Sequence, residues 1–168
     1  MTSPDIYLSL GSNIEPAKNL QKAVDALRNY CEVIAISNVY QSPPYGDTNQ
    51  PDFLDVVVKV QVERDPADFK VNVLRKIEKN LGRVRSPQNK YGPLTLDMDI
   101  LLWGDQIFDY GEKPWHVPNK GLTEFAADTL PLVELAPNIK HPETGETMRD
   151  LVKRLDTTGI VKTDIVIQ

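Results

Sequence analysis

The chain has little sulfur and little histidine. Its 168 residues include one cysteine, Cys31, and two histidines, His116 and His141. A single cysteine excludes an internal disulfide framework, and so few soft ligands disfavour a zinc site. No apolar run reaches the length of a membrane span, and the first residues lack the basic and apolar regions of a signal peptide. These absences predict a cytoplasmic protein with no membrane partner.

Net positive charge is also absent. The chain has 24 acidic and 19 basic side chains, for a formal charge of −5, which disfavours broad nucleic-acid binding. The phosphate loop G-x-x-x-x-G-K-[ST] and the protein-kinase motifs are missing. Basic residues nevertheless gather between Arg75 and Lys90, which predicts a local anion site within an acidic protein.

The most informative stretch that is present runs from residue 91 to 102, Y-G-P-L-T-L-D-M-D-I-L-L. A Gly-Pro loop leads into a strand on which Asp97 and Asp99 project from the same face. The alternating apolar residues, expected to face a core, are Met98, Ile100 and Leu102. Adjacent carboxylates need a cation or basic neighbours, and Mg²⁺ suits one or two carboxylates plus substrate phosphates. An exposed edge strand is the ordinary alternative, but aspartate is depleted in strands and arginines precede this one, which favours the metal site.

Periodicity along the chain predicts one α+β domain over residues 1–168. Strands are expected over 5–10, 33–40, 53–62 and 97–102, with helices starting near Pro16 and Pro66. This β-α-β-β-α-β order is ferredoxin-like, an antiparallel sheet with helices on one face. The C-terminal extension is expected to hold an edge strand near 106–108, helical pieces over 122–135 and 147–155, and a strand or loose tail over 156–168.

Several further residues suit phosphate. Arg83 and Arg85 follow the second helix, and a guanidinium group fits phosphate oxygens, although ordinary surface charge is the alternative. Arg75 and Glu78 lie three residues apart, where a helical ion pair explains them equally well. Tyr91 either stacks on a flat ring or covers its loop.

A second group suits a planar heterocycle. It comprises the loop 42–46, S-P-P-Y-G, and the segment 50–55, Q-P-D-F-L-D. An aromatic side chain there stacks on the ring, and Asp55 accepts hydrogen bonds from ring N–H and amino groups. The alternative, a proline-rich turn with a core phenylalanine, is slightly favoured by the pattern alone.

In this order, the segments resemble the 6-hydroxymethyl-7,8-dihydropterin pyrophosphokinase family of folate biosynthesis. The matching segments are 11–13, 40–44, 50–54, 77–78, 82–85, 91–93, 95–100 and 131–137. The similarity runs from about Tyr7 to Leu155. The resemblance implies transfer of pyrophosphate from ATP to the pterin hydroxymethyl group, with release of AMP. It implies ATP and a reduced pterin as partners, and we expect a monomer or weak homodimer.

The resemblance also implies roles for residues. Asp97 and Asp99 would hold two Mg²⁺ ions that bridge the ATP phosphates, and Arg83 would act during the chemical step. The implied nucleotide site holds Arg75, Glu78, Arg85, Tyr91, Ile100 and Asn119. The implied pterin site holds Ser42, Pro43, Tyr45, Phe53 and Asp55. The loops over 46–50 and 83–92 would close over the substrates.

The chain departs from the family's pattern at both substrate sites. Leu94 and Asn119 stand where the family usually has an arginine and a histidine that meet ATP. Asp55 replaces an asparagine, and Tyr91 replaces a tryptophan. By the same alignment, a second arginine of the family corresponds to Phe125, and its pterin-stacking phenylalanine corresponds to Ala127. Two alternatives therefore stay open: a paralogue that uses another pterin-like acceptor, and a non-catalytic nucleotide-binding protein.

Overall fold

The computed structural model describes residues 3–85, 87–88 and 90–168. Its main sheet is antiparallel, with strands in the order β5-β1-β4-β3-β8 and with β2 also paired to β4. The strands of this sheet are β1 (Ile6–Ser12), β2 (Glu32–Ile36), β3 (Tyr40–Ser42), β4 (Phe53–Gln61), β5 (Asp97–Trp103) and β8 (Val161–Lys162). The expected mixed architecture with an antiparallel sheet is confirmed.

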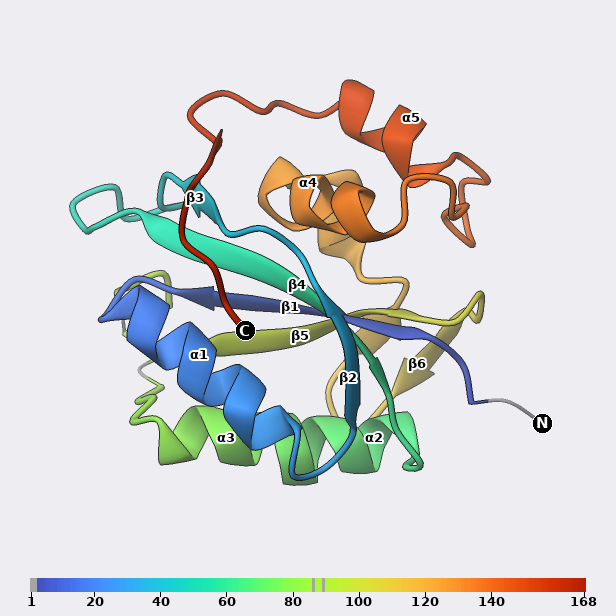
Figure 1. Cartoon of the computed structure of the whole chain (residues 1–168), viewed down its shortest axis with the longest axis horizontal. Coiled ribbons are helices and arrows are strands. Elements are labelled where there is room, and N and C mark those ends of the chain that lie inside the picture. Colours follow the sequence, from blue (N-terminus) through green and yellow to red (C-terminus); the bar gives the residue numbers. More distant parts are fainter. Residues whose placement is uncertain (1–2, 86, 89) are drawn as a thin grey trace.

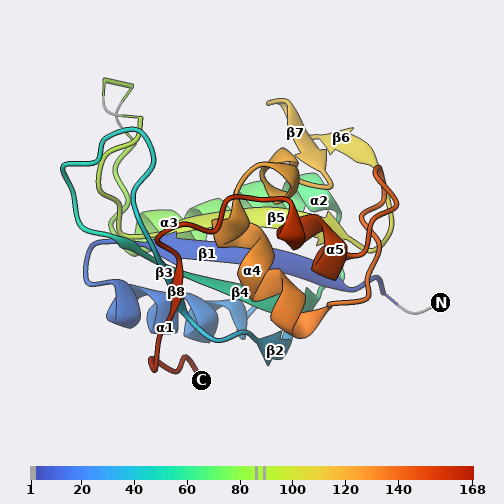
Figure 2. The same cartoon turned by 90° about the horizontal axis from the view of Figure 1, so that it is seen from above.

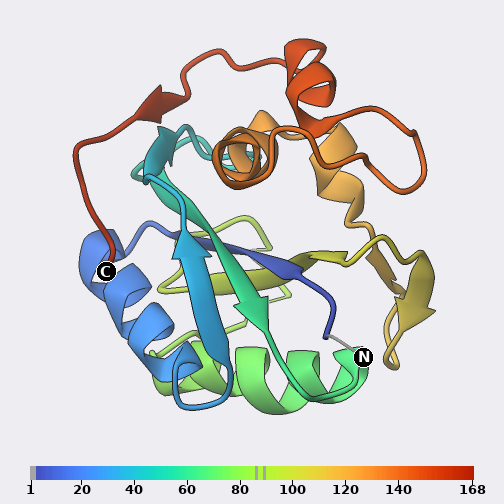
Figure 3. The same cartoon turned by 45° about the vertical axis from the view of Figure 1, so that its right-hand side comes forward.

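Helices cover both faces of the sheet (Figures 1 and 3). The first face carries α1 (Pro16–Leu27) and a continuous helical segment made of α2 (Pro66–Asp68), the π-helix η1 (Phe69–Leu74) and α3 (Arg75–Asn80). The second face carries α4 (Ala126–Leu135) and α5 (Met148–Lys153), which belong to the C-terminal extension (Figure 2). No helix within the described residues has the length and apolar character that crossing a membrane requires.

The core is accordingly divided by the sheet. On β4, Val56 and Val58 pack in the cluster beneath α1 and α3, whereas Val57 packs in the cluster that includes Leu132 of α4. A strand that is apolar on both sides is typical of a central position in a covered sheet. The valine run therefore places β4 at the middle of the molecule.

A register shift changes the apolar pattern of β5. Met98 and Ile100 pack in the first cluster, but Leu102 joins Leu101 in the second. The pairing with β1 shifts between Tyr7 and Leu8, so β5 has one extra residue at this point. A bulge of this kind exchanges the two faces of a strand. The prediction that Leu102 shares a face with Met98 is wrong for this reason.

The predicted strand over 33–40 is divided into β2 and β3. Between them the backbone amide of Ser37 donates to the Val57 carbonyl at 2.9 Å, and its hydroxyl accepts from the Val57 amide at 2.9 Å. A side-chain oxygen thus replaces a backbone carbonyl in the ladder, and the chain bends.

The C-terminal third differs from expectation in one place. β6 (Phe108–Tyr110) pairs with β7 (Trp115–Val117) in a separate two-stranded sheet, so the expected edge strand near 106–108 does not extend the main sheet. A 3₁₀ helix, η2 (Lys120–Thr123), then leads to α4. In the expected strand or loose tail over 156–168, only Val161 and Lys162 form a strand, β8, but Ile165 and Ile167 pack with the first cluster, so this segment is not a loose tail.

Candidate functional site

A cavity of about 890 Å³ lies between the sheet and the start of α4. Its floor is β1, where Gly11 pairs with Asp55 of β4 and with Asp97 of β5, and where Ser9 pairs with Asp99. A Cβ atom on Gly11 would lie 3.2 Å from Oδ1 of Asp55. The small residues of β1 therefore leave room for carboxylates from both neighbouring strands to share one space.

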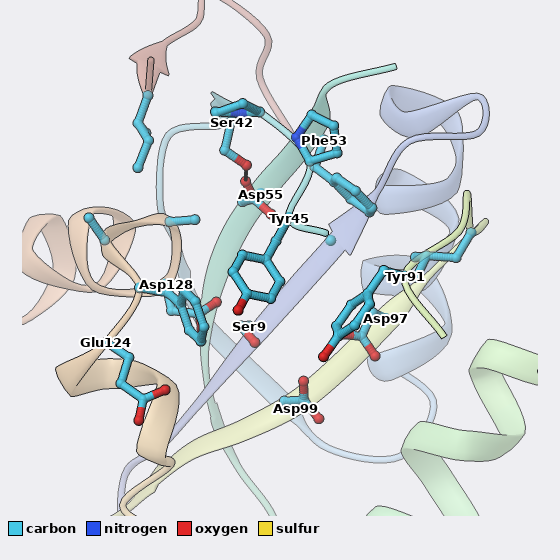
Figure 4. Close-up of a pocket in the computed structure, with 18 of the residues that line it drawn as sticks. Ser9, Ser42, Tyr45, Phe53, Asp55, Tyr91, Asp97, Asp99, Glu124 and Asp128 are labelled. Carbon is cyan, nitrogen blue, oxygen red and sulfur yellow. Dashed lines mark hydrogen bonds between the residues drawn. The ribbon is translucent and has the colours of Figure 1, made fainter. Parts of the chain in front are cut away.

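Figure 4 shows the carboxylates of Asp55, Asp97, Asp99 and Asp128 directed toward this space. Arg83 donates to Oδ1 of Asp97 at 2.7 Å, and Lys70 donates to Oδ1 of Asp99 at 3.0 Å. Burial, and then the charge of Asp99, raise the pKa of Asp97 to about 7, although Arg83 opposes the shift. Burial acts in the same direction on Asp99, but Lys70, with contributions from Asp97 and Arg83, outweighs it, and the pKa of that carboxyl is lowered. The two carboxyls thus differ in their tendency to hold a proton.

Glu78 organises the arginines behind this pair. Its carboxylate is buried and accepts hydrogen bonds from Arg83 at 3.2 Å, Arg85 at 2.7 Å and the backbone amide of Met98 at 2.8 Å. Glu78 therefore pairs with Arg83 and Arg85 rather than with Arg75. The guanidinium of Arg75 instead lies 4.8 Å from the ring centroid of Trp115.

The donor set suits a metal ion that takes few protein ligands. In the described part of the chain, no group of three or more histidine, cysteine, aspartate or glutamate side chains is arranged to hold a metal. Asp97 and Asp99 nevertheless project side by side, with 43% and 39% of their side chains exposed in the cavity. Mg²⁺ is commonly held by one or two carboxylates and completed by substrate phosphates and water. The pair fits that requirement.

The other end of the cavity is aromatic. The ring of Tyr45 makes edge-on contacts with Tyr91, at 5.4 Å between centroids, and with Phe125, at 5.3 Å. Phe53 and Asp55 line the same end. The Ser42 hydroxyl donates to Oδ2 of Asp55 at 2.5 Å. Burial, with a contribution from the charge of Asp97, nonetheless raises the pKa of Asp55 to about 7.

The sequence assigns no functional role to three residues that the structure places at this site. Phe125 was aligned with a lost arginine, yet it supplies a ring at the aromatic end. Asp128 lies in the first turn of α4, where an acidic residue is common because it favours the helix dipole. Burial and the charges of Asp55, Asp99 and Asp97 raise its pKa well above the usual range. One feature of the sequence could have indicated Lys70: this lysine lies on the same helix face as the apolar residues Val73 and Leu74, which are buried.

The loops around the cavity are tied together at their bases. Gly46 has a φ of +81°, and a Cβ atom there would lie 2.8 Å from the ring of Tyr91, so only glycine fits. The side chain of Gln50 donates to the Tyr91 carbonyl at 2.5 Å and accepts from Asn13 at 2.8 Å. The predicted closing loop over 83–92 includes Ser86 and Asn89, which lie outside the described residues.

The structure brings most of the predicted site residues together. Those that line the cavity are Ser42, Pro43, Tyr45, Phe53, Asp55, Arg83, Tyr91, Asp97 and Asp99. Leu94, at the position of a usual arginine, also lines it.

Five predicted nucleotide residues lie elsewhere among the described residues: Arg75, Glu78, Arg85, Ile100 and Asn119. The side chain of Ile100 is buried in the first core cluster, and Asn119 caps η2 by accepting from the Gly121 amide at 2.8 Å. Their roles toward a nucleotide stay predictions.

Known proteins are similar to this chain in sequence and in fold. The family model for 7,8-dihydro-6-hydroxymethylpterin-pyrophosphokinase matches residues 7–137. The 2-amino-4-hydroxy-6-hydroxymethyldihydropteridine pyrophosphokinase of Pseudomonas aeruginosa is 35% identical over 158 residues, which cover 92% of this chain and 94% of the relative. The protein of the same name from Methylorubrum extorquens is 36% identical over 162 residues, covering 94% and 98%.

A solved structure supports the fold independently. The crystal structure of wild-type Plasmodium falciparum HPPK-DHPS matches with a TM-score of 0.71 and 14% identity, over 91% of this chain. The match spans only 45% of that longer chain. Because the family model covers most of the sequence and the curated relatives align over nearly their whole length, the chain belongs to the 7,8-dihydro-6-hydroxymethylpterin-pyrophosphokinase family.

Proposed function

We propose that this chain transfers the pyrophosphoryl group of ATP to the hydroxymethyl group of 6-hydroxymethyl-7,8-dihydropterin and releases AMP. The observation that carries the proposal is a single cavity with two chemically different ends. One end has the Asp97 and Asp99 carboxylates with Arg83, and the other has aromatic rings with Asp55. Pyrophosphoryl transfer needs a polyphosphate and a planar heterocycle to meet at such a junction.

In the proposed reaction the pterin hydroxyl oxygen bonds to the β-phosphorus of ATP. The bond from that phosphorus to the oxygen shared with the α-phosphorus breaks, AMP departs, and the hydroxyl loses its proton. Mg²⁺, with two ions expected, would neutralise phosphate charge and favour in-line alignment when held by Asp97 and Asp99. Arg83 lies 2.7 Å from Asp97, so its guanidinium is already at the edge of the phosphate end.

At the acceptor end, Asp55 would receive the ring N–H and amino donors of the pterin. Its hydrogen bond from Ser42 fixes the carboxylate in place. Phe53 would stack on one face of the ring. Ala127 stands where the family usually has a pterin-stacking phenylalanine, and it has no ring. Phe125, which also lines the cavity, would supply part of the missing aromatic surface.

A second candidate is transfer to another pterin-like acceptor. Asp128 favours it, because a second carboxylate at the acceptor end would suit an additional hydrogen-bond donor on the substrate. A series of pterin acceptors, each tested for AMP release, separates the two candidates. The preferred acceptor is the one with the highest kcat/KM.

The test of the proposed function is incubation of the protein with Mg·ATP and 6-hydroxymethyl-7,8-dihydropterin. AMP is expected as the nucleotide product, whereas ADP would indicate an ordinary kinase. Asp97→Asn and Asp99→Asn should abolish AMP formation. The matched control is Asp25→Asn on the exposed side of α1, which should be as active as the wild type. ATP binding without AMP release from any acceptor would favour the non-catalytic alternative.

Four broader assignments accompany the proposal. We infer a ferredoxin-like core, supported by the strand order β5-β1-β4 with β2 and β3 beyond β4. A single domain over residues 1–168, a cytoplasmic location and a monomeric or weakly dimeric state stay predictions.

A further inference from the structure

The open edge of β5 is closed by charged side chains from the helical layer. β5 is the outermost strand of the sheet, so alternate backbone groups have no neighbouring strand. Lys70 donates to the Met98 carbonyl at 2.7 Å, and the Met98 amide donates to Glu78 at 2.8 Å. Two residues earlier along the chain, Arg83 donates to the Leu96 carbonyl at 3.0 Å. These contacts hold the backbone on both sides of Asp97.

Lys70 is the most enclosed cation of this group. Only 5% of its side chain is exposed, and its ammonium also donates to Oδ1 of Asp99 at 3.0 Å. The ammonium lies 5.7 Å from the ring centroid of Trp115. A buried charge is stable only when such partners surround it. These contacts therefore fix the Lys70 ammonium next to Asp99.

The helix geometry explains how a lysine reaches this place. Lys70 lies in η1, where six residues have π-helical hydrogen bonding. Its buried neighbours on this segment are Phe69, Val73 and Leu74. A π-helical turn is wider than an α-helical turn and changes the direction of its side chains, and such turns are frequent at functional sites. The segment thus carries a charged residue on a face that is otherwise apolar.

Asp55, Asp97, Asp99 and Asp128 bring four carboxyl groups into one cavity, and Lys70 places a positive charge beside Asp99. A resident ammonium repels a divalent cation that approaches the same carboxylate. Its hydrogen bond to Oδ1 of Asp99, at 3.0 Å, also fixes the orientation of that carboxylate. When ATP enters, its negative phosphates attract the divalent cation and outweigh the repulsion from Lys70.

We infer that Lys70 is a positioning residue that orients Asp99 and makes divalent-cation binding depend on the nucleotide. The inference rests on the proposed function, which supplies the metal and ATP as ligands. Lys70 suppresses metal binding to the free protein and leaves the site ready for a metal that arrives with the phosphates. The residue acts through Asp99 and does not itself touch the reacting atoms.

The test measures Mn²⁺ binding to the free protein by the electron paramagnetic resonance signal of unbound Mn²⁺. Lys70→Gln keeps a hydrogen-bond donor and removes the charge, and it should lower the Mn²⁺ dissociation constant on the order of ten-fold. Lys70→Arg keeps the charge and should bind Mn²⁺ like the wild type. The matched control is Lys76→Gln on the exposed side of α3, which should also match the wild type.

The nucleotide dependence gives a second measurement. With α,β-methylene-ATP, whose α–β bridge cannot be cleaved, Mn²⁺ affinity should rise in the wild type and rise less in Lys70→Gln. Adding Asp99→Asn to Lys70→Gln should remove the gain of the single variant. Lys70→Met, which matches the buried stem of lysine, replaces Lys70→Gln if thermal melting shows that the glutamine variant is unfolded.

An unchanged or weaker Mn²⁺ affinity in the folded neutral variants would overturn the inference and leave Lys70 a structural role only. The Mn²⁺ measurements require neither an acceptor nor turnover. A failure to form AMP would therefore overturn the proposed function while the result for Lys70 still stood.

Discussion

Replacing Glu78 tests whether this buried carboxylate holds Arg83 and Arg85 in place next to Asp97. The Glu78 side chain is 2% exposed and has three partners: Arg83, Arg85 and the Met98 amide. Glu78→Gln preserves the shape and removes the negative charge. The glutamine oxygen can still accept from one partner, but its amino group then faces an arginine, so the guanidinium of Arg83 loses one of its two carboxylates.

The magnitude follows from the burial of these groups. Removing one partner of a buried ion pair costs about 3–5 kcal/mol of unfolding free energy. Arg83 retains Asp97 at 2.7 Å, and Arg85 is half exposed, so we expect Glu78→Gln to lie at the lower limit. Glu78→Ala should lie higher, because the Met98 amide also loses its acceptor, at a further cost of about 1–3 kcal/mol. A loss of about 3 kcal/mol corresponds to a fall in Tm of roughly 6–12 °C for a domain of this size.

Urea unfolding of wild type, Glu78→Gln and Glu78→Ala gives these free energies. The control is Glu63→Gln, an exposed carboxylate in the connection between β4 and α2, which should change stability by less than about 0.5 kcal/mol. If Glu78→Gln costs less than about 1 kcal/mol, in the range of an exposed pair, water must satisfy these groups and the reasoning fails.

Three further predictions concern the cavity. Arg83→Ala should lower kcat much more than it weakens binding of an ATP analogue, and a pure affinity loss with unchanged kcat would contradict the role in the chemical step. Leu94→Arg should tighten Mg·ATP binding, by up to about ten-fold, because position 94 lines the cavity; calorimetry showing equal affinities would mean that Lys90 already compensates. The pKa of Asp55 is raised to about 7 by burial, so between about pH 4 and 7 the folded state holds a proton that the unfolded state has lost, and stability falls as pH rises. Asp55→Asn should make that decline shallower in thermal melts over this range, and an unchanged slope would exclude Asp55 as its source.

The sequence predicted the site best where a residue type conflicted with its local pattern. Two aspartates in an apolar strand required a reason, and Asp97 and Asp99 do face the cavity together. The prediction failed where pairing or packing between distant segments decided the outcome. The bulge opposite Tyr7 moves Leu102 to the same face as Leu101, and nothing within the strand itself indicates it.

Two other differences have the same origin. The segment near residue 108 pairs locally with β7, because a short hairpin closes before the main sheet is reached. Phe125, at the position of a usual arginine, received no role from the sequence, whereas its ring contacts that of Tyr45 in the structure. Side-chain placement across a cavity depends on such backbone directions, which periodicity does not encode.

The neighbouring carboxyls of Asp97 and Asp99 have a consequence for ligand binding, which we expect to be coupled to proton release. Burial, with the charge of Asp99, raises the pKa of Asp97 to about 7, so near neutral pH this carboxyl is partly protonated. A metal ion bound there favours the ionised form and releases the proton. The apparent binding enthalpy of Mg·ATP should then differ between buffers with different heats of ionisation, and the difference gives the number of protons released. Because protons would be products of binding, we expect the affinity of the site for Mg·ATP to rise with pH.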